Sequence, residues 1–509
     1  MTDSTTISDV RRDPLTDAQE PPVSMRDGDV APEDRVPVGQ KLAYGLGTTN
    51  DMWGNWLYPG MVWPVFNMFL LVSPGLVSTA VMINRLIDAV ADPVFGWLSD
   101  NTRSRWGRRR PYILIGSILS GLLLPTLFLV GRGWSERAYF WYMVVSSSIY
   151  ITVVSSFNMA YQSLGMELTP DYRERTSVYA FKSGVQKLPE IAMFFASAFI
   201  TLEVFNDRTG KPDILHGAQV YSVLLGAIMI LVGVVVFTFV KERYYGHVVS
   251  QKQSKTTLGD SVWKAMRCRP FRAQLAMALA YGIGTSMVGS LGYYATVYYV
   301  CKGDVALGSK WNFGMGLANM VFGLAGIPVY ATLARNVGKP KAMAAVQVSA
   351  ILVFIATWWL YTPSLVWLQL FASGLISFTG AGFWTLYGSI SADVVDYDEL
   401  DSGKRREGAF QSCQAWILKV GMALGMGAAG FLLTATGFDA ALGGNQPEHT
   451  LTLIRLYLAG IPVLGLLVAL YANGRFRPHR SKDARNSAVT RDTARQNLVF
   501  RARRDRSAS

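Results

Sequence analysis

The stretch NRLIDAVADPVFGWLSDNTRSRWGRRRP, residues 84–111, decides how the chain folds. Its first part continues an apolar segment that opens near Gly75, and a dense arginine cluster follows that segment. Arg85, Asp88 and Asp92 nevertheless lie inside the apolar part. Charged side chains at such depth are costly, so they are expected to face a partner or a wet cavity. The stretch therefore predicts a membrane helix with an internal charge cluster, ending in a basic loop.

The composition extends this interpretation to the whole chain. Of the 509 residues, 50% are hydrophobic and only 16% are charged. The apolar residues come in blocks of about 20 or more, long enough to cross a bilayer core of roughly 30 Å. A soluble protein of this length would carry more charge. The sequence therefore predicts an all-α polytopic membrane protein.

Hydropathy predicts twelve membrane spans. A polar stretch at 241–270 divides them into two groups of six, as in the major facilitator fold of two six-helix bundles. We expect a disordered N-terminal tail (1–40), a first bundle (41–240), a central loop (241–270), a second bundle (271–473) and a basic C-terminal tail (474–509). The expected spans are 42–72, 75–100, 111–132, 138–166, 174–203, 217–240, 271–300, 311–334, 342–361, 364–392, 407–436 and 450–473.

Lys and Arg gather in the connections that follow the even-numbered spans. The loop after span 2 holds five arginines, and the opposite connections hold few basic residues. By the positive-inside rule, both termini are predicted to be cytoplasmic and the protein to lie in the inner membrane. The net charge of +13 belongs largely to these loops and to the C-terminal tail, which we expect to meet anionic lipid rather than nucleic acid.

The two halves of the sequence echo each other. YGLGTT (44–49) matches YGIGTS (281–286), and DPVFGWLSD (92–100) matches IPVYATLAR (327–335). Asp171-Tyr172 and Asp396-Tyr397 follow spans 4 and 10. Three pairs in the same order favour a duplicated six-helix unit, which is typical of secondary transporters.

The charges of span 2 have predicted partners at matching depth. Asp88 and Asp92 lie roughly 18 and 12 Å from the cytoplasmic end and share one helix face. Arg85 lies one turn above Asp88. Lys419 of span 11 is level with Asp88, and Lys182 of span 5 is level with Asp92. Further polar residues from spans 1, 4 and 5 are expected nearby: Asp51, Ser155, Asn158, Lys182, Lys187 and Glu190.

These groups have two explanations. They are static ion pairs that hold helices together, or they form a site for a small cation. Two carboxylates on one face repel each other, so one is expected to hold a proton or to share a cation. That arrangement favours the cation site. Trp384, roughly 14 Å deep in span 10, is the best aromatic candidate for stacking on a sugar ring.

Other classes of function have little support. The three cysteines share no short spacing, and the four histidines lie in loops, at a helix edge or in the tail. They predict no metal centre, no disulfide framework and no cofactor. The spans hold no HExxH, GxSxG or comparable pair of nucleophile and base, so we do not expect an enzyme. A transporter-like sensor that signals through its tails remained a further alternative.

The quoted stretch resembles helices 2 and 3 of the glycoside–pentoside–hexuronide:cation symporters, the family of the bacterial melibiose permease within the major facilitator superfamily. SLGMELTPDYRERTSVYAFK (163–182) resembles the connection between helices 4 and 5. FWTLYGSISADVVDYDELDSGKRREGAFQSCQAWILKVG (383–421) resembles helices 10 and 11, with the intramembrane lysine of the family near its end. The resemblance runs from about residue 41 to 473 and leaves the tails outside.

The resemblance implies a role for each matching residue. Asp88 and Asp92 correspond to the carboxylates of the cation site, and Ser155 to a hydroxyl ligand. Lys419 and Arg85 correspond to the basic residues beside that site. Trp384, which also matches, corresponds to a tryptophan that lines the cavity.

The sequence departs from the melibiose permease mainly in the sugar half of the site. Asn158 and Gln162 stand where that protein has an aspartate and a tryptophan, and Lys182 replaces an arginine. The helix 1 aspartate aligns with Met52, with Asp51 one residue earlier. We retain Asp51, Asn158, Gln162 and Lys182, together with Trp384, as candidate substrate-binding residues, and a galactoside is not implied.

A further departure concerns the ion. Ala91 replaces a polar asparagine beside Asp92, which removes a possible Na⁺ ligand. Ser155, backbone and water oxygens could still complete a Na⁺ site, so H⁺ and Na⁺ both stay open, with H⁺ slightly favoured. The resemblance implies symport of a sugar, glycoside or uronide by a monomer. A second branch of the superfamily suggests an alternative solute, an amphipathic molecule such as a lysophospholipid.

The basic loop has two explanations as well. It is a plain orientation signal, or Asp100, Arg103 and Arg109 form a cytoplasmic gate with acidic residues of neighbouring helices, for which Asp171 and Glu174 are candidates. Lys187 and Glu190 have no counterpart in the resemblance, and the sequence assigns them no role.

Overall fold

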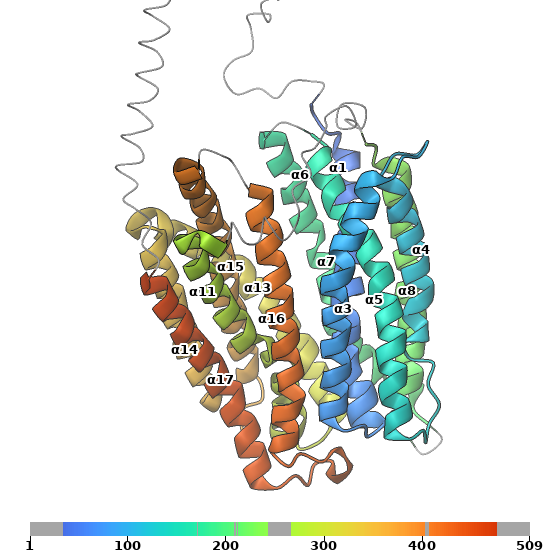
Figure 1. Ribbon diagram of the computed structural model, residues 1–509. Coiled ribbons are helices and arrows are strands. Elements are labelled where there is room, and N and C mark those ends of the chain that lie inside the picture. Colours follow the sequence, from blue (N-terminus) through green and yellow to red (C-terminus); the bar gives the residue numbers. More distant parts are fainter. Residues whose placement is uncertain are drawn as a thin grey trace, which may run out of the picture.

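The elements of the chain are helices that lie side by side in two bundles (Figure 1). The computed structural model describes residues 34–169, 172–207, 210, 212–242, 266–402 and 407–475. Most of the two tails and of the central loop that the sequence predicts lies outside these residues.

The first bundle holds six membrane segments, two of them broken into shorter helices. Segment 1 consists of α1, α2 and the π-helix η1, and segment 5 consists of α6 and α7. The bounds are α1 Val38–Leu46, α2 Thr48–Val62, η1 Trp63–Phe69, α3 Pro74–Asn101, α4 Arg110–Thr126, α5 Glu136–Glu167, α6 Tyr172–Val185, α7 Lys187–Ile200, the 3₁₀-helix η2 Glu203–Phe205 and α8 Ile214–Phe239.

The second bundle repeats this plan. Segment 7 consists of α11, α12 and the π-helix η3, and five long helices follow it. The bounds are α11 Arg269–Ser286, α12 Val288–Tyr294, η3 Ala295–Val300, α13 Val305–Val337, α14 Lys339–Leu360, α15 Leu368–Ser402, α16 Glu407–Ala435, the 3₁₀-helix η4 Ala440–Leu442 and α17 Glu448–Arg475. Each of the twelve expected spans overlaps one of these segments.

Segments 1 and 7, which carry the related motifs YGLGTT and YGIGTS, are interrupted at equivalent places. In both, an α-helix stops at a single residue, Gly47 or Met287, a second α-helix follows, and a π-helix ends the segment. A residue with positive φ comes just after each π-helix, Leu71 at 58° and Lys302 at 52°. The equivalent breaks support an internal duplication.

Segment 5 breaks for a simple reason. Pro189 has no N–H to donate to the carbonyl of Val185, where α6 ends. The carbonyl of Pro189 instead accepts a hydrogen bond of 2.9 Å from the indole of Trp53 on α2. A single continuous helix was expected here. The interruption is confined to Gln186, which keeps helical backbone angles, and α7 beyond it carries Lys187 and Glu190.

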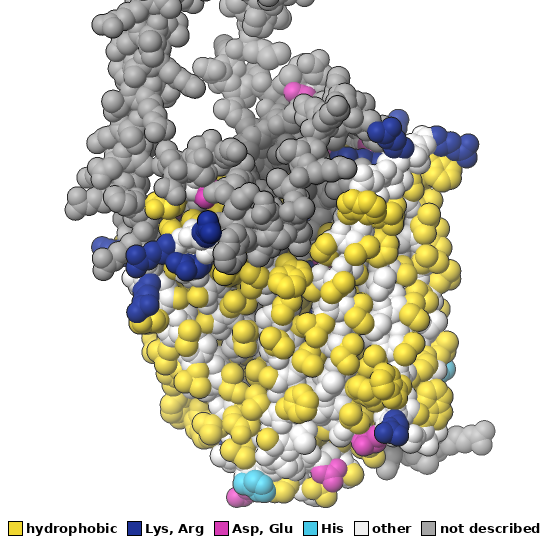
Figure 2. Space-filling model, in the orientation of Figure 1, with side chains coloured by type: hydrophobic (Ala, Val, Ile, Leu, Met, Phe, Trp, Pro, Cys, Tyr) yellow, Lys and Arg dark blue, Asp and Glu magenta, His cyan; other side chains and the backbone are white. Residues whose placement is uncertain are grey.

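The flank of the molecule is apolar. Hydrophobic side chains cover the face seen in Figure 2, and Lys and Arg gather near its upper rim. Large apolar side chains such as Trp97, Leu231 and Leu464 are more than 60% exposed, as expected of a surface that faces lipid. By length and composition alone, seven helices of the described residues qualify as membrane spans.

The two bundles converge away from the basic loop. We call the end that holds loop 102–109 the basic end and the opposite end the far end; the ribbons approach each other toward the far end (Figure 1). Tyr294 donates a hydrogen bond to Asn67 across this interface, and Asn312 donates one of 3.1 Å to Ser197. The ring of Phe194 lies where a Cβ on Gly316 would be. Close packing therefore joins the bundles at the far end.

Candidate functional site

Helices α3 and α16 meet across the two bundles and bring three charges together. Lys419 Nζ on α16 lies 3.0 Å from Asp88 Oδ2 and also donates a hydrogen bond to Asp92 Oδ2. The Asp88 side chain is 2% exposed, whereas that of Lys419 is 34% exposed. The contact predicted from helix depth is therefore present. It joins the carboxylates of one bundle to the ammonium group of the other.

The Oδ1 atoms of the two carboxylates differ in their hydrogen bonding. Asp88 Oδ1 accepts a hydrogen bond of 3.0 Å from the hydroxyl of Ser155 on α5. Asp92 Oδ1 is buried and has no hydrogen-bond partner among the described residues. A buried carboxylate oxygen without a partner is unfavourable unless it binds a proton or a cation. The cluster therefore has one oxygen free to accept a ligand.

Arg85 completes the cluster on the first bundle. Its guanidinium lies 3.7 Å from Asp88 Oδ2, donates to the backbone carbonyl of Asn55 and stacks on the ring of Trp56 at 4.7 Å. Two acidic and two basic side chains, those of Asp88, Asp92, Arg85 and Lys419, thus share one buried region with no net formal charge. A cation that binds here must therefore replace Arg85 or Lys419 beside the carboxylates.

The candidate substrate residues of the first bundle form a neighbouring group. Lys182 on α6 lies 3.8 Å from Asp51 on α2, and its ammonium lies 5.0 Å from the ring centre of Tyr161. Asp51 is within electrostatic range of Asp88 and Lys419 as well.

Two further candidate substrate residues lie on α5, in different surroundings. Asn158 is buried, and its Oδ1 has no hydrogen-bond partner among the described residues. Gln162, one turn further along the helix, is exposed.

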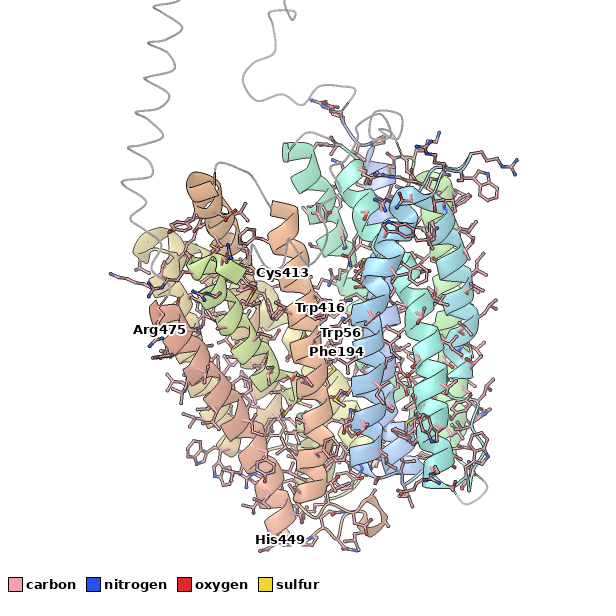
Figure 3. All side chains as sticks on the ribbon, viewed as in Figure 1. Trp56, Phe194, Cys413, Trp416, His449 and Arg475 are labelled. Atoms are coloured by element: carbon pink, nitrogen blue, oxygen red, sulfur yellow. The ribbon has the colours of Figure 1, made fainter. Side chains whose placement is uncertain are left out.

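A cavity of about 720 Å³ lies between the bundles. Helices α2, α3 and α7 line it from the first bundle, and segment 7, α13, α15 and α16 from the second. Trp56 and Phe194, which line it, lie between the bundles in Figure 3. Of the five predicted substrate residues, Trp384 is in the lining. The other four, on α2, α5 and α6, are not among the described lining residues.

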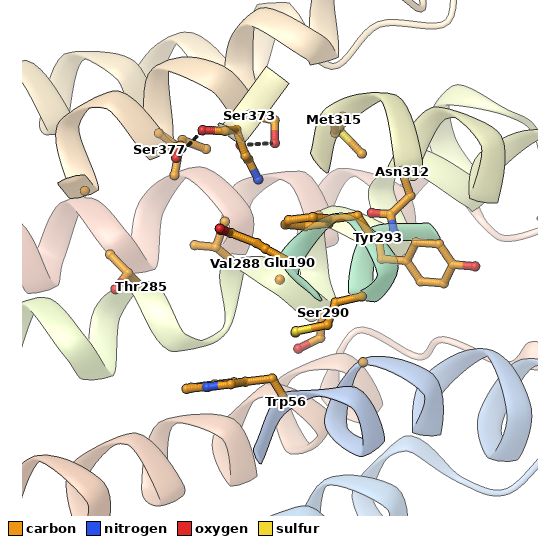
Figure 4. A pocket seen from close by; sticks show the side chains of 18 of the residues that line it. Trp56, Glu190, Thr285, Val288, Ser290, Tyr293, Asn312, Met315, Ser373 and Ser377 are labelled. Atoms are coloured by element: carbon orange, nitrogen blue, oxygen red, sulfur yellow. Dashed lines mark hydrogen bonds between the residues drawn. The ribbon is translucent and has the colours of Figure 1, made fainter. Parts of the chain in front are cut away.

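The charged residues of the described lining are Lys187 and Glu190, both on α7. Lys187 Nζ lies 2.7 Å from Glu190 Oε2. Figure 4 shows Glu190 reaching into the cavity between Ser373 and Ser377 on one side and Trp56 on the other. The sequence assigned these two charges no role. The hydropathy pattern does not reveal which face of α7 meets the cavity.

Two arginines of the basic loop pair with Glu167, an acidic residue that was not among the expected partners. Arg108 and Arg109 both pair with Glu167 at the end of α5, and Arg109 also donates to Ser99. Glu174 pairs with Lys41 at 2.8 Å. Arg103 is exposed, the side chain of Asp100 is outside the described set, and so is Asp171.

A second acidic residue sits at the start of α4. The Glu242 carboxylate accepts hydrogen bonds from the backbone N–H groups of Arg108, Arg109 and Arg110 at 2.9, 2.7 and 3.0 Å. These groups have no partner within the helix, so the carboxylate satisfies the helix N-terminus. Glu242 lies at the border of the central loop, and sequence spacing gave no signal for this contact.

Comparison with known proteins places the chain among transporters. A model of the family described as MFS/sugar transport protein matches residues 61–477. YagG of Escherichia coli (strain K12), provisionally named a glycoside/cation symporter, is 26% identical over 476 residues, covering 90% of this chain and 95% of that protein. The isoprimeverose transporter of Lactiplantibacillus pentosus is 25% identical, covering 77% and 79%. The raffinose carrier protein of Pediococcus pentosaceus is 25% identical, covering 85% and 68%.

Solved structures show the same fold. The inward-facing, unoccupied structure of a bacterial homologue of the human lysosomal transporter Spinster has a TM-score of 0.63, at 13% identity, and covers 86% of this chain and 96% of that one. A D-xylose–proton symporter has a TM-score of 0.60, at 14% identity, with coverage of 87% and 98%. At these identities the likeness supports the fold alone.

Proposed function

Because the chain belongs to the MFS/sugar transport protein family and, within it, to the glycoside–pentoside–hexuronide:cation symporters, we propose that it couples the movement of a sugar, glycoside or uronide to that of H⁺ or Na⁺. It is a multi-pass membrane transporter and not an enzyme. In this proposal it acts as a monomer in the cytoplasmic membrane, surrounded by lipid, with both termini in the cytoplasm.

One observation carries the proposal: Lys419 contacts both Asp88 and Asp92 from the opposite bundle. A coupling ion that binds either carboxylate neutralises its charge, and so competes with the lysine ammonium for that charge. The competition links occupancy of the ion site to the interface between α3 and α16, and so to the relative position of the bundles. Ion binding then favours the state that binds solute, and solute favours ion binding by the same factor.

The donor atoms favour one of the two ions. Na⁺ prefers several oxygen ligands, and Ala91 beside Asp92 contributes no side-chain oxygen. H⁺ needs a single carboxylate oxygen, and Asp92 Oδ1 is buried without a hydrogen-bond partner among the described residues. We therefore favour H⁺, with Asp92 as the group that carries it and Ser155 holding Asp88 in place.

The packing of the bundles supports an alternating-access cycle. The far end is joined by contacts such as Tyr294 with Asn67 and Asn312 with Ser197. With the basic end in the cytoplasm, this conformation corresponds to the inward-facing state. Transport then requires the far-end contacts to separate while the basic end closes.

The test is transport by the purified full-length protein in proteoliposomes. A panel of labelled sugars, glycosides and uronides is offered with an imposed proton gradient, with a Na⁺ gradient, and with each gradient collapsed by an ionophore. We expect at least one of these solutes to accumulate only while an ion gradient exists. Equal uptake with and without gradients contradicts symport, and uptake of a lysophospholipid in place of every sugar contradicts the solute class.

A further inference from the structure

The cavity between the bundles contains a charge pair separate from the cation cluster. Lys187 opens α7 directly after the break in segment 5, and Glu190 follows one turn later. Their side chains are 34% and 24% exposed although they lie between the bundles, because both line the cavity. Each is therefore accessible to a solute in that cavity.

The pair leaves the described cavity lining with no net charge. An anionic solute that approaches Lys187 also meets the Glu190 carboxylate, which lies 2.7 Å from the lysine ammonium. Such a solute would have to displace Glu190 from its partner and leave that carboxylate unpaired. Losing water around two carboxylates for one shared ammonium is unfavourable. The pair therefore works against a solute that carries a carboxylate.

A neutral solute with hydroxyl groups can instead form favourable hydrogen bonds with the pair. Glu190 keeps acceptor capacity beyond its bond to Lys187, and bonds from hydroxyls to a carboxylate are stronger than neutral ones. Across the cavity, Ser373 and Ser377 direct their hydroxyl hydrogens to Asn319 at 2.8 Å, so their oxygens can accept from a solute (Figure 4).

The aromatic lining adds a second type of contact. Trp56 comes from the first bundle and Trp384 from the second, and both line the cavity. Indole rings offer apolar faces to the C–H side of a sugar ring. Acceptors for hydroxyl groups together with aromatic faces are the chemistry that recognises a sugar.

We propose that Glu190 accepts hydrogen bonds from hydroxyl groups of the solute, and that the Lys187–Glu190 pair selects neutral sugars and glycosides over uronides. The inference rests on the proposed function and narrows its solute class. On this inference, residues of α7 determine which solute binds, whereas the sequence predicted substrate-binding residues on α2, α5 and α6.

Matched solute pairs test this inference. The probes are p-nitrophenyl glycosides and p-nitrophenyl glycuronides of the same ring configuration, which differ only in a CH₂OH or a carboxylate at C6. Binding to the purified full-length protein is followed by quenching of tryptophan fluorescence. We expect the wild type to bind the neutral member of a pair about tenfold or more tightly than the uronide.

Substitutions at the pair give opposite expectations. Glu190→Gln removes the charged acceptor and leaves Lys187 unpaired, so affinity for the neutral probe falls about tenfold or more and the preference shifts toward the uronide. Glu190→Asp keeps the carboxylate and restores part of the preference. Asp393→Asn is the matched control, because Asp393 pairs with Lys339 at 2.6 Å outside the cavity lining; it leaves the preference unchanged.

The outcomes separate this inference from the function on which it rests. If the uronide binds more tightly, or if Glu190→Gln leaves the preference unaltered, the inference is wrong. Accumulation of the uronide in preference to its neutral partner under an ion gradient would leave the proposed symport standing and overturn the inference alone. If neither member of any pair binds or accumulates, the sugar assignment falls together with the inference.

Discussion

The guanidinium of Arg85 lies 4.7 Å from the centre of the Trp56 ring and also faces Asp88 Oδ2 at 3.7 Å. Trp56 lines the cavity between the bundles, so one arginine touches both a wall of that cavity and a carboxylate of the cation cluster. A solute that moves Trp56 would alter the surroundings of Asp88. The contact provides a short physical link between the proposed solute site and the proposed ion site.

Replacing Trp56 with Leu should weaken this link. The variant loses the stacking contact with Arg85, worth about 0.5–2 kcal/mol, and one aromatic wall of the cavity. We expect weaker solute binding and a smaller effect of the coupling ion on the solute Kd. The measurement is that Kd at high and at low ion concentration. Trp106→Leu, which removes a similar stack with Arg105 at 5.0 Å on the basic loop, is the control. An unchanged ion effect in Trp56→Leu would refute the link.

Removing one hydroxyl group should weaken the interface between the bundles at the far end. Tyr294→Phe leaves Asn67 Oδ1 without its tyrosine donor, which costs roughly 1–3 kcal/mol in a buried place. Because this bond joins the two bundles, we expect the population to shift away from the inward-facing state. Distances between spin labels on the two bundles would report the shift. Tyr330→Phe breaks a bond to Ser349 within one bundle and should leave the distances unaltered.

Gly107 and Glu242 form a second testable contact. Gly107 has φ of +102°, and a Cβ added there would come within 2.6 Å of the Glu242 carboxylate. Gly107→Ala should strain the backbone and displace the carboxylate that satisfies the start of α4, a loss of about 2–4 kcal/mol. The apparent unfolding midpoint in detergent measures this loss. Gly133→Ala, at φ of +77° with nothing within 4 Å of an added Cβ, isolates the backbone strain. Equal losses in both variants would show that the Glu242 contact is unimportant.

Ion choice and solute choice are expected to separate. Ala91→Asn places an amide oxygen next to Asp92 and should increase the stimulation of transport by Na⁺ at fixed pH. Glu190→Gln, in the cavity lining, should change the solute profile and leave the ion preference alone. Uptake of the solute panel with and without Na⁺ checks both variants. The reverse result, an ion effect at Glu190 and a solute effect at Ala91, would show that this division is wrong.

Much of the fold was predictable because hydrophobic length and positive charge are local properties. Each predicted span corresponds to a segment of the structure, and the depth of Asp88 and Lys419 along their helices predicted that these two meet. Depth also placed Lys182 level with Asp92, but Lys182 lies beside Asp51. Helix rise and side-chain face suffice for such a prediction when the spans are long and regular.

The rest depends on geometry that a hydropathy pattern does not contain. Lys187 and Glu190 line a cavity that both bundles together form, and the helix interruption beside them follows from a single missing N–H at Pro189. The stacking of Trp56 on Arg85 and the approach of Glu242 to α4 join residues far apart in the chain. The resemblance to the melibiose permease predicted substrate residues at positions where this sequence carries different side chains. It therefore placed the substrate site on α5 and α6 rather than on α7.

The central claim is that Asp88 and Asp92 bind the coupling ion in competition with Lys419, and one comparison tests it most directly. Asp92→Asn and the control Asp393→Asn are reconstituted, and each is assayed for exchange of labelled solute at equilibrium and for accumulation driven by an ion gradient. We predict that Asp92→Asn still exchanges solute but no longer accumulates it, while the control does both. Accumulation by Asp92→Asn at the wild-type level would contradict the claim.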